Sequence, residues 1–331
     1  MRALFVNEGA LGAGVLGHVR VGETLETHFR GTGVEPRFTV LPPMSAVTRA
    51  VVRQVPGLGH ADLDLQTLRW HLAQALRARR VVRAELRREP ADVLHLHAHT
   101  LSFLVPDVMR RIPTLVSLDA TVWEWHQMGI WRQPRRHSRA ALAPSLALER
   151  RALESAARVL AFTRWAREAV ERAAPRARVI EHHPGIDLEA FRPAPRASDA
   201  RARVLFVGGR FAEKGGHDVL EALGPHAGRE LDLDIVTPAR IPSRPGVTVQ
   251  RLGPADPGLL ELFRRADVFC LPTYGDAVPL SVVEAMACGA AVVATDVGAM
   301  RDLLDDGRAG RLVRAGDPRG LRAAVLALTA N

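Results

Sequence analysis

Short apolar runs alternate with longer amphipathic segments along the first half of the chain. The apolar runs at 2–7, 38–42, 91–98 and 113–120 are separated by helical patterns, of which 64–89 is the longest. Short apolar runs bounded by turn residues are typical of buried strands, and an apolar repeat of 3.6 residues is typical of amphipathic helices. The alternation predicts a parallel sheet covered by helices on both faces.

The same alternation restarts after a segment of different composition. Residues 191–203 are rich in proline, alanine and arginine, and 204–331 again alternates apolar runs with helical segments. We interpret 1–190 and 204–331 as two doubly wound, Rossmann-like α/β domains that face each other across a cleft, joined by the linker 191–203. In such sheets ligands bind outside the carboxyl ends of the strands, so candidate residues are sought in the loops after them.

The composition is that of an ordinary globular protein. Hydrophobic residues make up 47% of the chain and charged residues 24%, which is usual for such proteins. No apolar run reaches the roughly 18 residues of a membrane-spanning helix, and the N-terminus turns acidic and glycine-rich too early for a signal peptide. We therefore expect a cytoplasmic protein, with Cys270 and Cys288 as reduced core thiols.

The formal net charge of +9 would suit nucleic acid, an anionic membrane surface or phosphorylated substrates. The arginines do not form one tail but recur through helical segments, interleaved with glutamate and alanine. We expect most of them on solvated helix faces, with peripheral contact at an anionic membrane as the main alternative and no nucleic acid partner.

A single lysine, Lys214, stands in the glycine-rich stretch "VGGRFAEKGG", between an expected strand and an expected helix. Glycines let the backbone approach a phosphate, and a helix N-terminus adds partial positive charge. Arg210 offers a planar fork, whereas the ammonium of Lys214 is a compact charge that fits between two phosphates. This pattern indicates a diphosphate site, although the spacing alone is equally compatible with a helix-capping turn that carries two solvated cations.

Two carboxylates stand eight positions apart in "GDAVPLSVVEAMACG". Asp276 lies in an expected loop and Glu284 in the helix after it, so both can turn into the same cleft. A buried carboxylate is costly unless it binds something, and the hydroxyls of a ribose are suitable partners. An exposed Glu284 on the open side of the helix is the alternative.

Together these motifs resemble the retaining nucleotide-sugar glycosyltransferases of the GT-B fold, specifically family 4. "GRFAEKG" is similar to the family's diphosphate motif and "DAVPLSVVEAMACG" to its paired-glutamate motif, while "HHPGIDLEAFRP" and "FRRADVFCLPT" resemble two further signatures. The resemblance covers nearly the whole chain. It implies transfer of a hexose from a nucleoside diphosphate sugar to an acceptor hydroxyl of a glycan, lipid or small metabolite, with retention and without a metal or other cofactor.

The resemblance also implies roles for individual residues. Arg210 and Lys214 would hold the pyrophosphate, Glu284 the ribose and Asp276 the donor sugar, while Asp119 would orient the acceptor or the donor sugar. The catalytic residues expected on this basis are Asp119, Arg210, Lys214 and Asp276. The expected donor-binding residues are Gly17, Gly209, Arg210, Lys214, Thr237, Leu252, Val278, Pro279, Leu280 and Glu284.

Three features depart from the family pattern. Asp276 replaces the first glutamate of the pair, Leu118 stands where many members have a histidine, and the chain ends at 331, so we expect the second domain to lack the usual terminal helix. These departures leave open a catalytically silent nucleotide-sugar-binding subunit of a glycan-assembly complex. An epimerase or a sugar-phosphate phosphorylase on the same fold is a further alternative.

Histidines and aromatic residues in the first domain offer two weaker signals. His95, His97 and His99 alternate along an expected strand, a spacing compatible with metal binding. Members of the family often carry the first two of these histidines without a metal, so we expect none here. The tryptophans that follow Asp119, at 123, 125 and 131, are suited to stacking on sugars, to core packing or to a lipid-facing loop.

Overall fold

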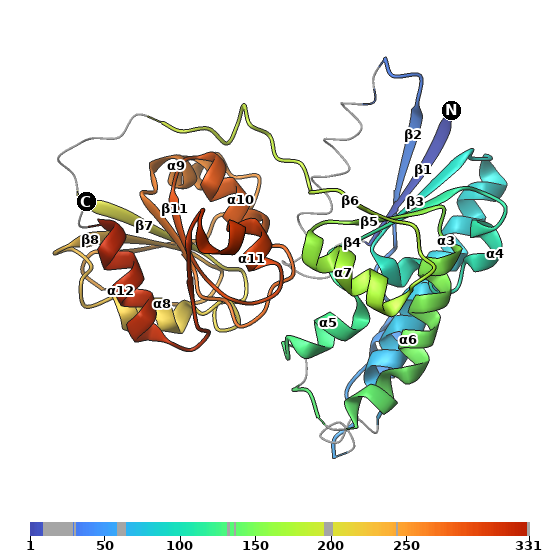
Figure 1. Cartoon of the computed structure of the whole chain (residues 1–331), viewed down its shortest axis with the longest axis horizontal. Helices are drawn as coiled ribbons and strands as arrows, with labels where there is room; N and C mark the ends of the chain where they lie inside the picture. Colours follow the sequence, from blue (N-terminus) through green and yellow to red (C-terminus); the bar gives the residue numbers. More distant parts are fainter. Residues whose placement is uncertain are drawn as a thin grey trace. The chain divides into compact units, whose positions relative to one another are not determined.

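The computed structural model describes residues 1–8, 29, 31–57, 64–130, 133–135, 137–194, 201–242 and 244–329. Gly17, expected to bind the donor, lies outside the described residues, as do Trp131 and most of the glycine-rich loop after the first strand. The chain divides into two compact units, Met1–His183 and Pro184–Asn331 (Figure 1).

Among the described residues, the first unit has a six-stranded parallel sheet in the order β2-β1-β3-β4-β5-β6. Strands buried on both faces read as continuous apolar runs, which is why the sequence revealed most of them. The strands are β1 (Arg2–Asn7), β2 (Glu35–Val40), β3 (Val93–His97), β4 (Thr114–Leu118), β5 (Arg158–Ala161) and β6 (Val179–Glu181).

The longer helices of the first unit, α3, α6 and α7, bury apolar residues on one face, in agreement with their amphipathic patterns. The longest helix, α3, buries Ala75, Ala78 and Val82 at intervals of three and four residues, the spacing of one helix face. The described helices are α2 (Ala46–Val51), α3 (Gln66–Arg88), α4 (Pro106–Met109), α5 (Val122–Gln127), α6 (Ser138–Ser155) and α7 (Arg164–Ala173), with the 3₁₀ turn η3 (His99–Ser102) after β3.

The three histidines do not share one strand face, so that expectation was wrong. β3 ends at His97, and His99 begins η3 after Ala98, whose φ is +119°. His95 Nε2 and His97 Nδ1 each lie 3.0 Å from Ser117 Oγ on β4. Among the described residues, no group of three or more histidine, cysteine, aspartate or glutamate side chains is arranged to hold a metal ion.

The second unit repeats the architecture, with a parallel sheet in the order β12-β11-β10-β7-β8-β9 among its described residues. Its strands are β7 (Ala202–Val207), β8 (Leu231–Val236), β9 (Val247–Gln250), β10 (Val268–Leu271), β11 (Ala291–Thr295) and β12 (Arg311–Val313). Its helices are α8 (Gly216–Leu223), α9 (Pro257–Arg265), α10 (Leu280–Ala287), α11 (Met300–Leu303) and α12 (Pro318–Thr329), with the 3₁₀ turn η4 (Asp305–Gly307).

The second unit begins before the expected linker, because the chain divides between His183 and Pro184. Phe191 is buried in the second core, where its ring centroid lies 5.8 Å from that of Phe263. Cys270 and Cys288 are buried and form no disulfide, as predicted, and burial raises the pKa of Cys270 to about 12. None of the described helices has the length and apolar character needed to cross a bilayer.

Candidate functional site

Lys214 and Asp276 meet at the carboxyl edge of the second sheet. Lys214 lies in the loop between β7 and α8, and Asp276 lies in the loop between β10 and α10. Since β7 and β10 are hydrogen-bonded neighbours, their loops leave the sheet at adjacent points. Lys214 Nζ donates to Asp276 Oδ2, and the two side chains are 20% and 16% exposed. Two of the expected catalytic residues are therefore in direct contact, although they stand 62 positions apart in the sequence.

The two loops approach closely because Gly215 has no side chain. Its φ is +76°, and a Cβ atom there would lie 2.0 Å from the carbonyl oxygen of Pro272. The loops are also joined by a hydrogen bond from Tyr274 N to Glu213 O, at 2.9 Å. The glycine after Lys214 therefore permits the contact that brings Lys214 to Asp276.

The backbone at Asp276 packs closely against the loop after β11. A Cβ atom at Gly298 would lie 1.9 Å from the backbone oxygen of Asp276. Ala299 N donates to Ala277 O at 3.1 Å in the same region. Asp276 thus sits on a backbone that leaves no space for a larger residue at position 298.

Arg210 occupies the same loop as Lys214 but is more exposed. Its Nη1 lies 2.8 Å from Glu213 Oε2, and its side chain is 38% exposed. Lys214 N donates to Arg210 O at 2.9 Å, so the two residues flank one tight turn, and the exposed Gly209 precedes it. Arg210 is thus paired with Glu213 in the structure, and a contact between Arg210 and a diphosphate stays a prediction.

The expected donor-binding residues Val278, Pro279 and Leu280 lie at the N-terminal end of α10, in the same unit. Pro279 is the N-cap of α10 and its carbonyl accepts from Val282 N at 3.0 Å; Val278 precedes it and Leu280 begins the helix. The first amides of a helix have no partner within it and are available to a ligand. Glu284 is half-buried on α10. Its side chain is therefore neither fully buried nor fully exposed, and a contact with a ribose stays a prediction.

Thr237 and Leu252 follow β8 and β9, on one side of β7. Thr237 is buried, its amide donates to Gln250 O at 3.0 Å, and its hydroxyl accepts from Ala239 N at 3.3 Å. Leu252 is half-buried against the core of the second unit. Both side chains are therefore used by their own unit, and a donor contact for either stays a prediction.

Asp119 directly follows β4, at the carboxyl edge of the first sheet. Its Oδ1 accepts from the indole Nε1 of Trp125 at 3.3 Å. Leu118, in contrast, is 2% exposed and packs in the core of the first unit. The polar group that β4 presents at this edge is therefore Asp119, and position 118 has a packing role.

Glu8 is a polar residue at this edge that the sequence analysis missed. Its Oε1 accepts from Gln74 Nε2, and Gln74 Oε1 in turn accepts from Arg77. Burial raises the pKa of Glu8 to about 7, with Arg77 lowering it and the negative charge of Asp119 raising it further. The signal in the sequence was an acidic residue immediately after the first strand.

Tyr274 was also missed, although it is the chain's sole tyrosine. It lies in the same loop as Asp276, two positions before it, and its hydroxyl donates to Asp218 Oδ2 at 2.9 Å. Partial burial and the bond to Asp218 raise the pKa of Tyr274. Tyr274 thus links the loop after β10 to α8, the helix that Lys214 precedes.

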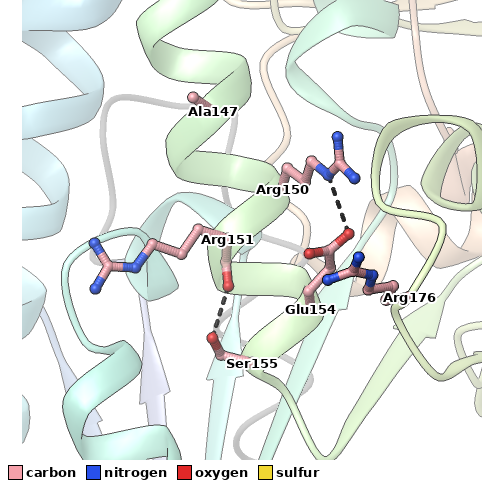
Figure 2. Close-up of a pocket in the computed structure, with 6 residues that line it drawn as sticks. All are labelled: Ala147, Arg150, Arg151, Glu154, Ser155 and Arg176. Carbon is pink, nitrogen blue, oxygen red and sulfur yellow. Dashed lines mark hydrogen bonds and ion pairs between the residues drawn. The ribbon is translucent and has the colours of Figure 1, made fainter.

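A shallow cleft of about 440 Å³ lies at the opposite edge of the first sheet. It is bounded by the end of α6, just before β5, and by the segment just before β6. Arg150 Nε donates to Glu154 Oε1 at 3.0 Å, while Arg150 and Arg151 extend from α6 in different directions (Figure 2). The lining residues are Ala147, Arg150, Arg151, Glu154, Ser155 and Arg176.

Comparison with solved structures shows the fold of the two units. Sucrose-phosphate synthase from Thermosynechococcus elongatus superposes with a TM-score of 0.66 at 18% identity, over 100% of this chain and 90% of that one. Anabaena HepE in complex with UDP and glucose superposes with a TM-score of 0.63 at 16% identity, over 100% of this chain and 92% of that one. The two Rossmann-like units are those of the GT-B glycosyltransferases.

The sequence identifies the family within that class. Residues 20–190 match Glycosyltransferase Family 4, and 201–331 match Glycosyl transferases group 1. The D-inositol 3-phosphate glycosyltransferase of Thermobispora bispora is 30% identical over 327 residues, which cover 87% of this chain and 74% of that protein. The chain belongs to glycosyltransferase family 4, so the predicted fold and the predicted glycosyltransferase class are confirmed.

Proposed function

We propose that this glycosyltransferase moves a hexose from a nucleoside diphosphate sugar to an acceptor hydroxyl, with retention at the anomeric carbon. The observation that carries the proposal is the contact between Lys214 and Asp276. A ligand held by both side chains must present an anionic group beside hydroxyl groups. A diphosphate joined to a sugar has this arrangement, and HepE, which has the same fold, binds UDP and glucose.

In the proposed reaction an acceptor oxygen bonds to the anomeric carbon as the bond from that carbon to the phosphate oxygen breaks. The departing diphosphate takes the acceptor proton on the same face, which accounts for retention. Lys214 and Arg210 stabilise the negative charge that develops on the leaving group, the largest contribution to be expected in such a site. Asp276 and Asp119 orient the reacting sugars, and Glu284 accepts hydrogen bonds from the ribose.

The acceptor is proposed only as a class, namely a hydroxyl of a glycan, a lipid or a small metabolite. D-inositol 3-phosphate is the first compound to test, because the Thermobispora bispora relative is named for it. Proteins of one fold differ in substrate specificity because their loops differ. The name of this relative therefore suggests an experiment and does not assign the acceptor of this protein.

A panel of UDP-, GDP- and ADP-sugars tests the proposal through thermal stabilisation of the protein. A donor at 100 times its Kd should add about 2.7 kcal/mol to the free energy of unfolding. Donors that stabilise are then incubated with and without acceptors, and the released nucleoside diphosphate is measured. Slow release supports a transferase, binding without release supports a silent subunit, and stabilisation by none of the donors overturns the proposal.

We expect activity to survive EDTA. The cations Lys214 and Arg210, together with helix N-termini, supply positive charge at the proposed diphosphate site. The measurement is transfer rate after EDTA treatment and desalting, alongside the metal content of the protein. Loss of activity that Mg²⁺ or Mn²⁺ restores would show that a metal supplies the charge we assign to the side chains.

Glu284→Gln and Asp276→Asn should affect different kinetic constants. Glu284→Gln should raise the donor KM about tenfold with little change in kcat, because ribose contacts are the same in ground state and transition state. Asp276→Asn should mainly lower kcat, since it acts at the reacting sugar and its ion pair with Lys214 is lost. Equal changes in both constants for both variants would contradict these separate roles.

Peripheral contact with an anionic membrane also belongs to the proposal, and the arginine-lined cleft supports it. Arg151 and Arg176 have no ion-pair partner in the described part of the chain and stand exposed at the edge of the sheet remote from Asp119. Each cation near an anionic surface adds about 1 kcal/mol to binding.

Phosphatidylglycerol vesicles should therefore sediment the protein at low salt and release it at high salt. The double variant Arg151→Gln/Arg176→Gln should bind about 30-fold more weakly, the equivalent of about 2 kcal/mol. Arg322→Gln, which removes an exposed arginine of the second unit, is the control and should bind normally. Binding that ignores salt and lipid charge would exclude this contact.

A further inference from the structure

A glutamate inside the first unit caps α5. Glu149, on α6, is fully buried, and its Oε1 accepts from Val122 N at 2.8 Å. Val122 is the first residue of α5, which packs against α6 (Figure 1). The N-cap residue Thr121 makes no capping bond, because its hydroxyl donates instead to Glu124. Glu149 therefore supplies an acceptor for the first amide of α5, one of those that have no partner within the helix.

The first turn of α5 is tied to Asp119 in two ways. Only Ala120 and Thr121 separate Asp119 from Val122, so the start of the helix and the carboxylate share a short backbone segment. Trp125, one turn into α5, donates from its amide to Thr121 O at 3.0 Å and from its indole to Asp119 Oδ1 at 3.3 Å. Displacement of this turn would move the backbone and the indole that hold Asp119.

We propose that Glu149 is a positioning residue for Asp119, acting through Val122 and Trp125. The inference rests on the proposed role of Asp119 in orienting a sugar. A role in packing alone would be served better by an apolar side chain, because Glu149 Oε2 has no hydrogen-bond partner among the described residues and buried unpaired oxygens are costly. What Glu149 adds beyond packing is the acceptor for Val122 N.

Burial, more than any neighbouring charge, raises the pKa of Glu149 and keeps it uncharged near neutral pH. His99 Nε2, from η3, lies 3.3 Å from Glu149 Oε1, and burial with nearby His71 lowers the pKa of His99 to about 3. Burial and the charge of Glu124 on α5 raise the pKa of Glu149 to about 8, against the hydrogen bond from Val122. Glutamine, neutral and of the same shape, is therefore the matched substitution at this position.

Glu149→Ala and Glu149→Gln test the proposal, because a positioning role predicts a change in kcat without a change in the donor KM. Glu149→Ala should lower kcat about tenfold to a hundredfold, since small misplacements of reacting groups have effects of that size. The donor KM should stay unchanged, because the proposed diphosphate and ribose contacts lie in the second unit. Glu149→Gln, which keeps the acceptor oxygen, should recover most of kcat. Glu168→Ala, an exposed glutamate on α7, is the control and should match the wild type.

A double-mutant cycle tests the route. Trp125→Phe removes the indole donor and keeps a smaller aromatic ring, and its effect on kcat should not add to that of Glu149→Ala. If Glu149→Ala does not fold, Glu149→Asp, which withdraws the carboxyl by one methylene, replaces it. Additive effects, a normal kcat for the folded variant, or a donor KM that rises in step with falling Tm would overturn the inference.

A readout without turnover separates this inference from the proposed function. The indole ¹H–¹⁵N signal of Trp125, assigned through its loss in Trp125→Phe, should shift in Glu149→Ala and return in Glu149→Gln. An unmoved signal overturns the positioning route, whatever the activity of the protein. A moved signal in a protein that transfers no sugar supports the coupling of Glu149 to Asp119 and counts against the proposed function alone.

Discussion

Lys214→Ala should lower kcat at least about 100-fold, the cost of removing one donor aimed at a developing negative charge. Lys214→Arg should lower it nearly as far, although it keeps the charge. The ammonium of Lys214 contacts Asp276, and the side chains of both residues are largely buried. A planar guanidinium has a different shape and reach from the compact ammonium.

The measurement is kcat for both variants with a donor chosen by thermal stabilisation, after the folded state of each has been checked. Arg322→Lys makes the reverse exchange at an exposed position of α12 and should leave kcat unchanged. A Lys214→Arg enzyme with near-normal turnover would refute the need for a compact charge. Equal loss in the control would show that the effect is general to such exchanges.

Gly215→Ala should lower the free energy of unfolding by about 3 kcal/mol and abolish transfer. Its φ of +76° disfavours any Cβ, and that atom would lie 2.0 Å from Pro272 O. A left-handed residue costs about 1–2 kcal/mol and an overpacked site about 1–3 kcal/mol more. Relief of the clash would separate the loops after β7 and β10 and take Lys214 away from Asp276.

Urea unfolding and donor binding measure this effect. Gly253→Ala is the matched control, because a Cβ there meets no atom within 4 Å and the residue has no positive φ, so its stability should change by no more than about 0.5 kcal/mol. A Gly215→Ala protein of normal stability that still binds a donor would show that the loops can part without loss of the site.

The local signals at the site were readable from the sequence, but the partners of most side chains were not. The stretch from Gly209 to Lys214 predicted a tight turn after a strand. This prediction was possible because the glycines and charged residues that indicate such a turn are neighbours in the sequence. Glu149 gave no such signal, since a glutamate among arginines on an amphipathic helix reads as exposed. Its burial arises where α6 packs against η3 and α5, which no window of sequence contains.

By itself, the sequence determined the two alternating α/β patterns, the glycosyltransferase family and the loops that carry Lys214, Asp276 and Asp119, because periodicity and motif spacing depend on neighbouring residues. The tertiary structure decided which of these residues meet. Lys214 contacts Asp276 because β10 pairs with β7. The negative charge of Asp119 raises the pKa of Glu8, although β3 lies between the strands that carry the two residues. Strand order is set by packing between distant segments, so contacts across a sheet edge follow from the fold and cannot be read along the chain.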